Sequence, residues 1–222
     1  MKHIINMERL NTLRAGVLGS NDGILTVVGV LLSVGVATNN RFTILMAGLS
    51  DLLACAFSMS TGEYSSVSSQ KDTELSLIKL EKKLIKEEPQ KELLTIKEYY
   101  KSHGVSNVTS ELIAKQLMKT NALNTLLRIK YNITNSYMNP WYAALSSFVS
   151  ALSGGFFPLL AMLIFKENMR WMATIMAVIL VVAITGYLSA KLSNGSIKKS
   201  IIRNIIVGII TMCIHYEIGL LI

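Results

Sequence analysis

Long apolar stretches alternate with charged ones along this chain. Five of them are built mainly from Leu, Ile, Val, Ala, Met and Gly, and they cover residues 16–37, 43–62, 141–165, 171–190 and 204–222. A helix needs about 20 residues to cross a hydrocarbon core of roughly 30 Å. The sequence therefore predicts an all-α, polytopic membrane protein with five transmembrane helices.

The section between the second and third apolar stretches has a different pattern. Residues 64–139 are charged and amphipathic, and Gly104 is the one glycine among them. Pro89 suits the first turn of a helix, Gly104 suits a helix end, and either Ser106 or Asn107 is a good N-cap. We expect a small cytoplasmic helical insertion here, with its first helix continuous with the second span. The predicted division of the chain is 1–15 (amphipathic lead-in), 16–63 (spans 1 and 2), 64–139 (insertion) and 140–222 (spans 3 to 5).

The distribution of charge predicts a topology. The formal net charge is +8, and only 16% of residues are charged, against about 25% in soluble domains. Basic residues gather before the first span, in the insertion and before the last span, whereas the other side has Arg41, Lys166 and Arg170. The positive-inside rule then predicts a cytoplasmic N-terminus and insertion and an external C-terminus. Because the basic residues follow the spans, we expect a lipid bilayer and no nucleic-acid partner, and the short N-terminus favours a prokaryotic plasma membrane.

Polar residues are few in the first two spans, and their placement suggests an ion path. Asp22 lies in the first span, while Asp51, Cys55, Met59 and Glu63 recur every fourth residue in the second and so share one helix face. An ionisable group at membrane depth is costly and is therefore a candidate transport residue. Each has a structural alternative. Asp22 could cap the helix or bond to Asn21 and neighbouring backbone, and Asp51 could bond across helices. The alternative is core packing for Cys55 and Met59, and a lysine pair for Glu63.

Four stretches carry a resemblance to a known family. They are L-G-S-N-D-G-I-L-T (18–26), the run from Ala47 to Glu74 containing S-M-S-T-G-E-Y-S-S-V-S-S-Q-K-D, Q-L-M-K-T-N-A-L (116–123) and N-P-W-Y-A-A-L-S-S-F (139–148). With them the chain resembles the vacuolar iron transporter and nodulin-like proteins. The resemblance implies a five-span homodimer that carries Fe²⁺, and often Mn²⁺, out of the cytoplasm in exchange for protons. It also implies that Asp22 and Met59 lie on the ion path.

The same resemblance assigns candidate metal ligands in the insertion. Glu81, Glu92 and Met118 match positions at which the family binds metal with glutamates and a methionine. Three further carboxylates that the family pattern implies are replaced, by Leu84, Thr95 and Asn121. The structural alternative for Glu81 and Glu92 is a solvated helix face on which Glu and Lys alternate.

Two functions follow as hypotheses. The first is a divalent-metal transporter in which Fe²⁺ or Mn²⁺, as substrate, enters past Glu63 and Met59 and passes Asp22 at a dimer seam formed by the glycine-rich first span. The second is a non-transporting membrane metal sensor or assembly partner, which the missing carboxylates motivate. We expect no enzyme and no resident cofactor, since the chain has neither a phosphate-binding glycine loop nor an H-E-x-x-H motif.

Overall fold

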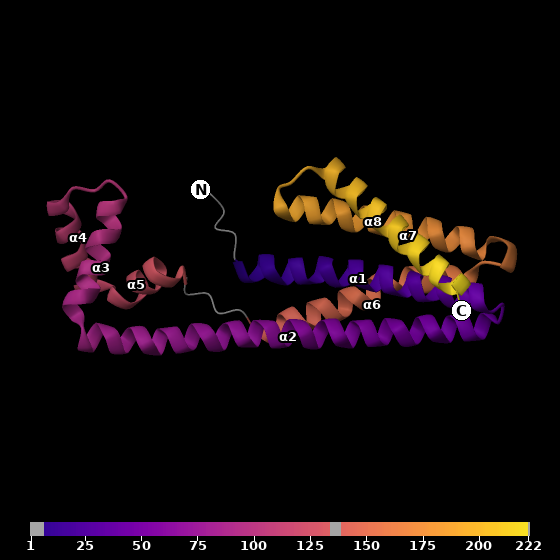
Figure 1. The fold of residues 1–222 in the computed structure, drawn as a ribbon, viewed down its shortest axis with the longest axis horizontal. Coiled ribbons are helices and arrows are strands. Elements are labelled where there is room, and N and C mark those ends of the chain that lie inside the picture. The colour runs from indigo at the N-terminus through magenta and orange to yellow at the C-terminus, as the bar shows by residue number, and fades with distance from the viewer. Residues whose placement is uncertain (1–6, 134–138, 222) are drawn as a thin grey trace. The chain divides into compact units, whose positions relative to one another are not determined.

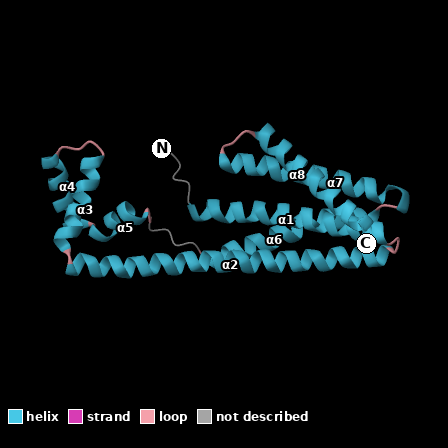
Figure 2. Ribbon diagram, in the orientation of Figure 1, coloured by secondary structure: helices cyan, strands magenta, loops and turns pink. Residues whose placement is uncertain are grey.

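The computed structural model describes residues 7–133 and 139–221, and within these ranges it is helical without strands (Figure 2). The helices are α1 (Met7–Ala37), α2 (Arg41–Glu87), α3 (Pro89–Ser102), α4 (Asn107–Thr120), α5 (Ala122–Tyr131), α6 (Pro140–Ile164), α7 (Glu167–Ser193) and α8 (Ile197–Leu221). Five of them, α1, α2, α6, α7 and α8, are long and apolar enough to cross a membrane. The all-α class with five candidate spans is thus confirmed.

The chain forms two compact units. Unit 1 comprises Met1–Val67 and Asn139–Ile222, and unit 2 comprises Ser68–Met138 (Figure 1). Helix α2 contributes its first part to unit 1 and its remainder to unit 2. Unit 1 therefore contains the apolar spans, and unit 2 contains the charged helices of the insertion.

Unit 1 is built around α1. One face of α1 packs on α7 and α8 through a buried apolar cluster: Ile24, Val28, Leu32, Val178, Val181, Val182 and Met212. An adjacent face packs on α2 and α6 through a second cluster: Val27, Leu31, Ile44, Leu52, Leu159 and Met162. Because α1 has neighbours on two faces (Figure 1), polar side chains in its middle, such as Asp22 and Thr26, are at least half-buried among helices of the same chain.

The glycines of α1 allow α6 to approach closely. A Cβ at Gly23 would lie 2.2 Å from the carbonyl oxygen of Ala151, and one at Gly154 would lie 2.2 Å from that of Ser20. Small residues at such contacts let helix backbones pack tightly inside membranes. Gly19 and Gly23 of α1 therefore contact α6 of the same chain, whereas Gly29 meets His215 of α8. The dimer seam along the first span stays a prediction.

The outer surface of unit 1 suits a lipid environment. Along α7, Met172, Met176, Leu180 and Ile184 recur every fourth residue, and all four side chains are exposed. Such a long exposed apolar stripe is unfavourable in water. A hydrocarbon layer covers it at no cost, which agrees with α7 being one of the five candidate spans.

Unit 2 is a small helical cluster with its own core. Pro89 stands at the start of α3, and the Ser106 hydroxyl caps α4 by accepting a hydrogen bond from the Thr109 amide at 3.2 Å. Its fully buried apolar residues are Ile96, Ala114 and Leu126. The local helix signals of the sequence thus coincide with the ends of these helices.

Two helices begin earlier than the apolar stretches of the sequence indicate. Helix α1 begins at Met7 and continues without a break into the first candidate span, Thr12–Ala37, and the interfacial position of the lead-in stays a prediction. Asp22 consequently lies in the interior of α1, which excludes the helix-capping alternative. Helix α8 begins at Ile197 instead of residue 204, because hydrogen bonding continues through Arg203. Residues 1–6 of the expected lead-in lie outside the described residues.

Candidate functional site

Polar groups of α1 and α2 meet inside unit 1. Asp22 and Thr26 are one turn apart on α1, and the Thr26 hydroxyl faces both Asp51 and Cys55 of α2. Asp22 and Asp51 each lie close enough to the Cys55 thiol for their charges to act on it. The structure therefore brings together two carboxylates, a thiol and a hydroxyl on the facing sides of the first two spans.

Two oxygen atoms of this cluster lack a partner. Among the described residues, neither the Thr26 hydroxyl nor the Oδ2 atom of Asp51 completes a hydrogen bond of normal geometry, although both atoms are buried. An unsatisfied buried oxygen is costly, and a carboxylate oxygen more so than a hydroxyl. A bound cation or proton would relieve that cost, so the cluster has the properties of a transient ion site.

His215 of α8 completes the surroundings of Asp51. The side chain lies within electrostatic range of Asp51. The imidazole Nδ1 donates a hydrogen bond to the Thr211 carbonyl at 2.9 Å. The other edge of the ring packs against Gly29 of α1, where an added Cβ would lie 2.7 Å from Nε2. The Ser33 hydroxyl donates to the His215 backbone carbonyl at 2.7 Å and ties α8 to α1. Three helices thus converge on Asp51.

Met59 and Glu63 continue the same face of α2, one and two turns beyond Cys55. Both side chains are half-buried. No group of three or more His, Cys, Asp or Glu side chains that could together hold a metal ion occurs within residues 7–133 and 139–221.

The two candidate glutamates of unit 2 are buried and share one cation. Glu81 is 0% exposed and Glu92 is 2% exposed. The Lys130 ammonium lies 2.9 Å from Glu81 Oε1 and also forms an ion pair with Glu92. The structure therefore brings these glutamates together, as a shared metal would require, but with a lysine between them. The solvated-face alternative is wrong for both residues.

Further contacts complete this buried ion cluster of Glu81, Glu92 and Lys130. The Tyr131 hydroxyl donates to Glu81 Oε2 at 3.3 Å. Burial lowers the pKa of Lys130, but its hydrogen bonds to Glu92 and Glu81 outweigh that effect and leave the pKa above its ordinary value. Met118 is half-buried and packs against the apolar core of unit 2. A positively charged lysine thus occupies the centre of the cluster at neutral pH.

Three contributors were missed by the sequence analysis. Lys130 is one of many lysines in the insertion, and its separation of 49 positions from Glu81 gives no sequence signal. Thr26 could have been found, since it lies one turn after Asp22 on the same helix face. His215 lies near the end of the last apolar stretch, but its approach to Asp51 depends on how α8 packs on α1.

Comparison with known proteins gives a consistent result across nearly the whole chain. The model of the VIT family matches residues 13–220. A protein named vacuolar iron transporter from Acanthamoeba castellanii is 32% identical over 222 residues, which cover 99% of this chain and 82% of that protein. Vacuolar iron transporter homolog 3 of Arabidopsis thaliana is 29% identical over 94% of this chain and 82% of its own length. Vacuolar iron transporter homolog 2 of Oryza sativa is 42% identical over 72 residues, or 32% of this chain and 38% of its own length.

Proposed function

Because this chain belongs to the VIT family, we propose that it transports a divalent metal ion, Fe²⁺ or Mn²⁺, out of the cytoplasm in exchange for protons. The similarity to proteins named iron transporters supports the metal as substrate. Those relatives are eukaryotic, so they lend no support to a prokaryotic plasma membrane, which stays a prediction like the orientation of the termini. The proposal assigns the chain no catalytic activity.

The observation that carries the proposal is the unpartnered polar cluster between α1 and α2. Asp51 Oδ2 and the Thr26 hydroxyl are buried without a hydrogen-bond partner among the described residues, and Asp22 lies in the same cluster. Folding alone gains nothing from such a cluster inside apolar spans. A path that binds an ion briefly and then releases it requires oxygens that are not permanently satisfied.

Each residue then has a role in the route. Glu63 and Met59 receive the metal at the end of the α2 face, and Asp51 and Asp22 bind it deeper in unit 1. Carboxylate and thioether ligands suit ions of intermediate softness such as Fe²⁺ and Mn²⁺. Protonation of Asp22 or Asp51 removes the negative charge that holds the metal, and so it couples metal release to proton entry.

The insertion has a subordinate role in this proposal. A metal ion at Glu81 and Glu92 has to compete with the Lys130 ammonium, which already neutralises one of the two carboxylates. Met118 adds a thioether only if it leaves the apolar core in which it packs. The spans of unit 1, and not the insertion, therefore carry the transport function.

A flux assay tests the proposal directly. The full chain is reconstituted into liposomes with an acidic lumen, and uptake of Mn²⁺ and Fe²⁺ is compared for the wild type, Asp22→Asn and Asp51→Asn. We expect uptake to depend on the pH gradient and to fall about tenfold or more in each variant, the scale seen when groups of a metal site are lost. Glu217→Gln is the matched control, because this carboxylate is exposed on α8. Equal uptake in the wild type and both variants would exclude the cluster from the mechanism.

The same assay separates transport from the alternative function. A membrane sensor or assembly partner would bind metal without moving it, so the wild type would show no uptake at any pH gradient.

We also propose a homodimer, as the family resemblance implies.

A further inference from the structure

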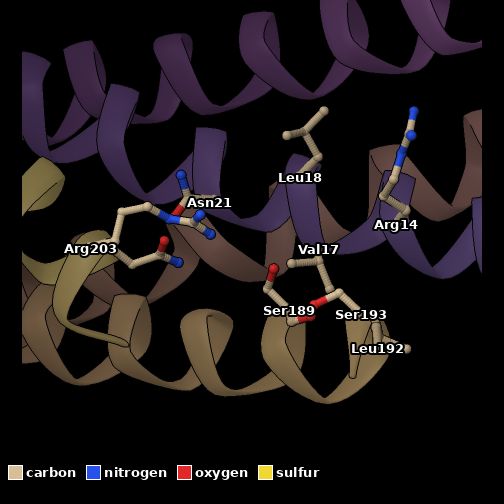
Figure 3. A pocket seen from close by; sticks show the side chains of 9 residues that line it. Arg14, Val17, Leu18, Asn21, Ser189, Leu192, Ser193 and Arg203 are labelled. Carbon is tan, nitrogen blue, oxygen red and sulfur yellow. Dashed lines mark hydrogen bonds between the residues drawn. The ribbon is translucent and has the colours of Figure 1, made fainter. Parts of the chain in front are cut away.

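A pocket at one end of unit 1 shares no residue with the polar cluster. It has a volume of about 340 Å³ and is lined by α1, α7 and α8. Its lining, here called the basic pocket, consists of Arg14, Val17, Leu18, Asn21, Ser189, Leu192, Ser193, Arg203 and Asn204. Figure 3 shows the Arg203 guanidinium beside Asn21, with Arg14 extending from α1 at the other end of the pocket.

The lining combines positive charge, neutral polar groups and an apolar wall. Arg14 and Arg203 are its charged members, and none of the nine lining residues is acidic. Neither arginine forms an ion pair within the described part of the chain. The Asn204 amide is held in place by the Thr185 hydroxyl at 3.4 Å. Two cations without counter-ions beside fixed polar groups favour an anionic ligand.

The basic pocket lies near the ends of three candidate spans. Ser193 is the last residue of α7, and Arg203 is the seventh residue of α8. At a rise of 1.5 Å per residue, Arg203 lies about 9 Å from the start of α8. Arg14 is close to the start of the first span, Thr12–Ala37. The polar groups therefore stand near the ends of three spans, at the depth of the interface.

The apolar wall distinguishes a lipid from a soluble anion. Leu18 is 55% exposed, and with Val17 and Leu192 it extends the basic pocket onto the lipid-facing surface of the spans. A free phosphate gains nothing from these side chains, whereas an acyl chain covers them. Basic pockets between transmembrane helices are known to bind the head groups of anionic lipids.

We propose that the basic pocket is a binding site for an anionic phospholipid, whose phosphate contacts Arg203 and Asn21 and whose acyl chain covers the apolar wall. Arg14, at the other end, adds a second positive charge to the same head group. The lipid thereby links α1 to the turn between α7 and α8. This site is separate from the metal route and does not depend on it.

Native mass spectrometry of the full chain in a neutral detergent tests the proposal. Phosphatidylglycerol and phosphatidylcholine are added in turn, and bound lipid is counted for the wild type and for Arg14→Gln/Arg203→Gln. We expect a phosphatidylglycerol adduct that weakens about fivefold for each arginine removed, since one basic residue at a membrane surface contributes about that factor. Lys198→Gln/Lys199→Gln is the matched control, because it removes two charges beside the same helix end, outside the pocket, and should keep the adduct.

A second variant tests the basic pocket independently, in case the arginine double variant does not fold. Leu18→Trp keeps both arginines but fills the apolar wall, and it should also lose the phosphatidylglycerol adduct. Equal losses in the lysine control would overturn the proposal in favour of diffuse attraction. Displacement of the lipid by millimolar inorganic phosphate would instead indicate a soluble-anion site. Conversion of a wild-type dimer to a monomer by the arginine variant would show that a second copy occupies the pocket. Each of these three results refutes a lipid site.

Discussion

Replacing Lys130 by methionine removes the cation shared by two buried carboxylates. In the wild type the ammonium lies 2.9 Å from Glu81 and also pairs with Glu92, and these side chains are 0% and 2% exposed. Methionine has a similar length and no charge, so the change leaves the shape of the cluster nearly intact. Two like charges then face each other in the interior of unit 2, and we expect the unit to open far more readily.

The size of the effect follows from the burial of the pair. At 2.9 Å and an effective dielectric constant of about 20, the attraction between one carboxylate and the ammonium is about 6 kcal/mol. Much of this is offset by the desolvation of both charges, and the loss of one partner of a buried pair costs about 3–5 kcal/mol. That range corresponds to an increase of about 150- to 5,000-fold in the opening equilibrium of α3, α4 and α5.

Hydrogen exchange of the full chain in detergent measures this opening at each amide of unit 2. Lys91→Met is the matched control: Lys91 pairs with Glu88 at 2.8 Å, but the lysine side chain is 70% exposed, and exposed pairs contribute little. We expect unchanged protection in the control and much lower protection in Lys130→Met. Added Mn²⁺ should restore protection in Lys130→Met by replacing the ammonium. If Lys130→Met exchanges like the wild type, the two glutamates are not held by Lys130 and the reasoning fails.

Three further predictions concern charge and packing. Lys115 and Lys97 donate hydrogen bonds to Glu111 and lower its pKa to about 2. These contacts stabilise unit 2 at pH values above the ordinary glutamate pKa, and the stabilisation is lost as the pH falls toward 2. A ¹³C titration should therefore give Glu111 a pKa near 2, and Lys115→Met should raise that pKa. The pKa of Lys130 is raised. Its ion pairs therefore stabilise unit 2 fully below the ordinary lysine pKa of about 10.4, and they are lost as the pH rises through the raised pKa. A ¹³C-lysine titration that finds Lys130 deprotonated below pH 10 would contradict this. Gly154→Ala should lower the melting temperature, at a cost of about 1–3 kcal/mol, because its Cβ would lie 2.2 Å from the Ser20 carbonyl oxygen. Gly62→Ala is its control, since that Cβ meets no atom within 4 Å, and it should leave the protein as stable as before or more so.

The architecture was largely predictable because it depends on local patterns. Apolar stretches of about 20 residues predict spans wherever they occur, and the helices of unit 2 begin where proline and serine indicate a first turn and an N-cap. The α2 face of Asp51, Cys55, Met59 and Glu63 follows from helical periodicity alone. These features arise between residues a few positions apart, which any sequence displays directly.

The partners of the polar residues were decided by tertiary structure. The glycines of α1 predict close packing, but the sequence does not say which helix approaches them, and the structure places α6 against Gly19 and Gly23. Lys130 reaches Glu81 across 49 positions and His215 approaches Asp51 across 164, contacts that depend on how whole helices pack. By itself the sequence determined the spans and the candidate carboxylates. The fold determined which carboxylates are neutralised and which keep an unpartnered oxygen, because that depends on the desolvation and charge of neighbours distant in the chain.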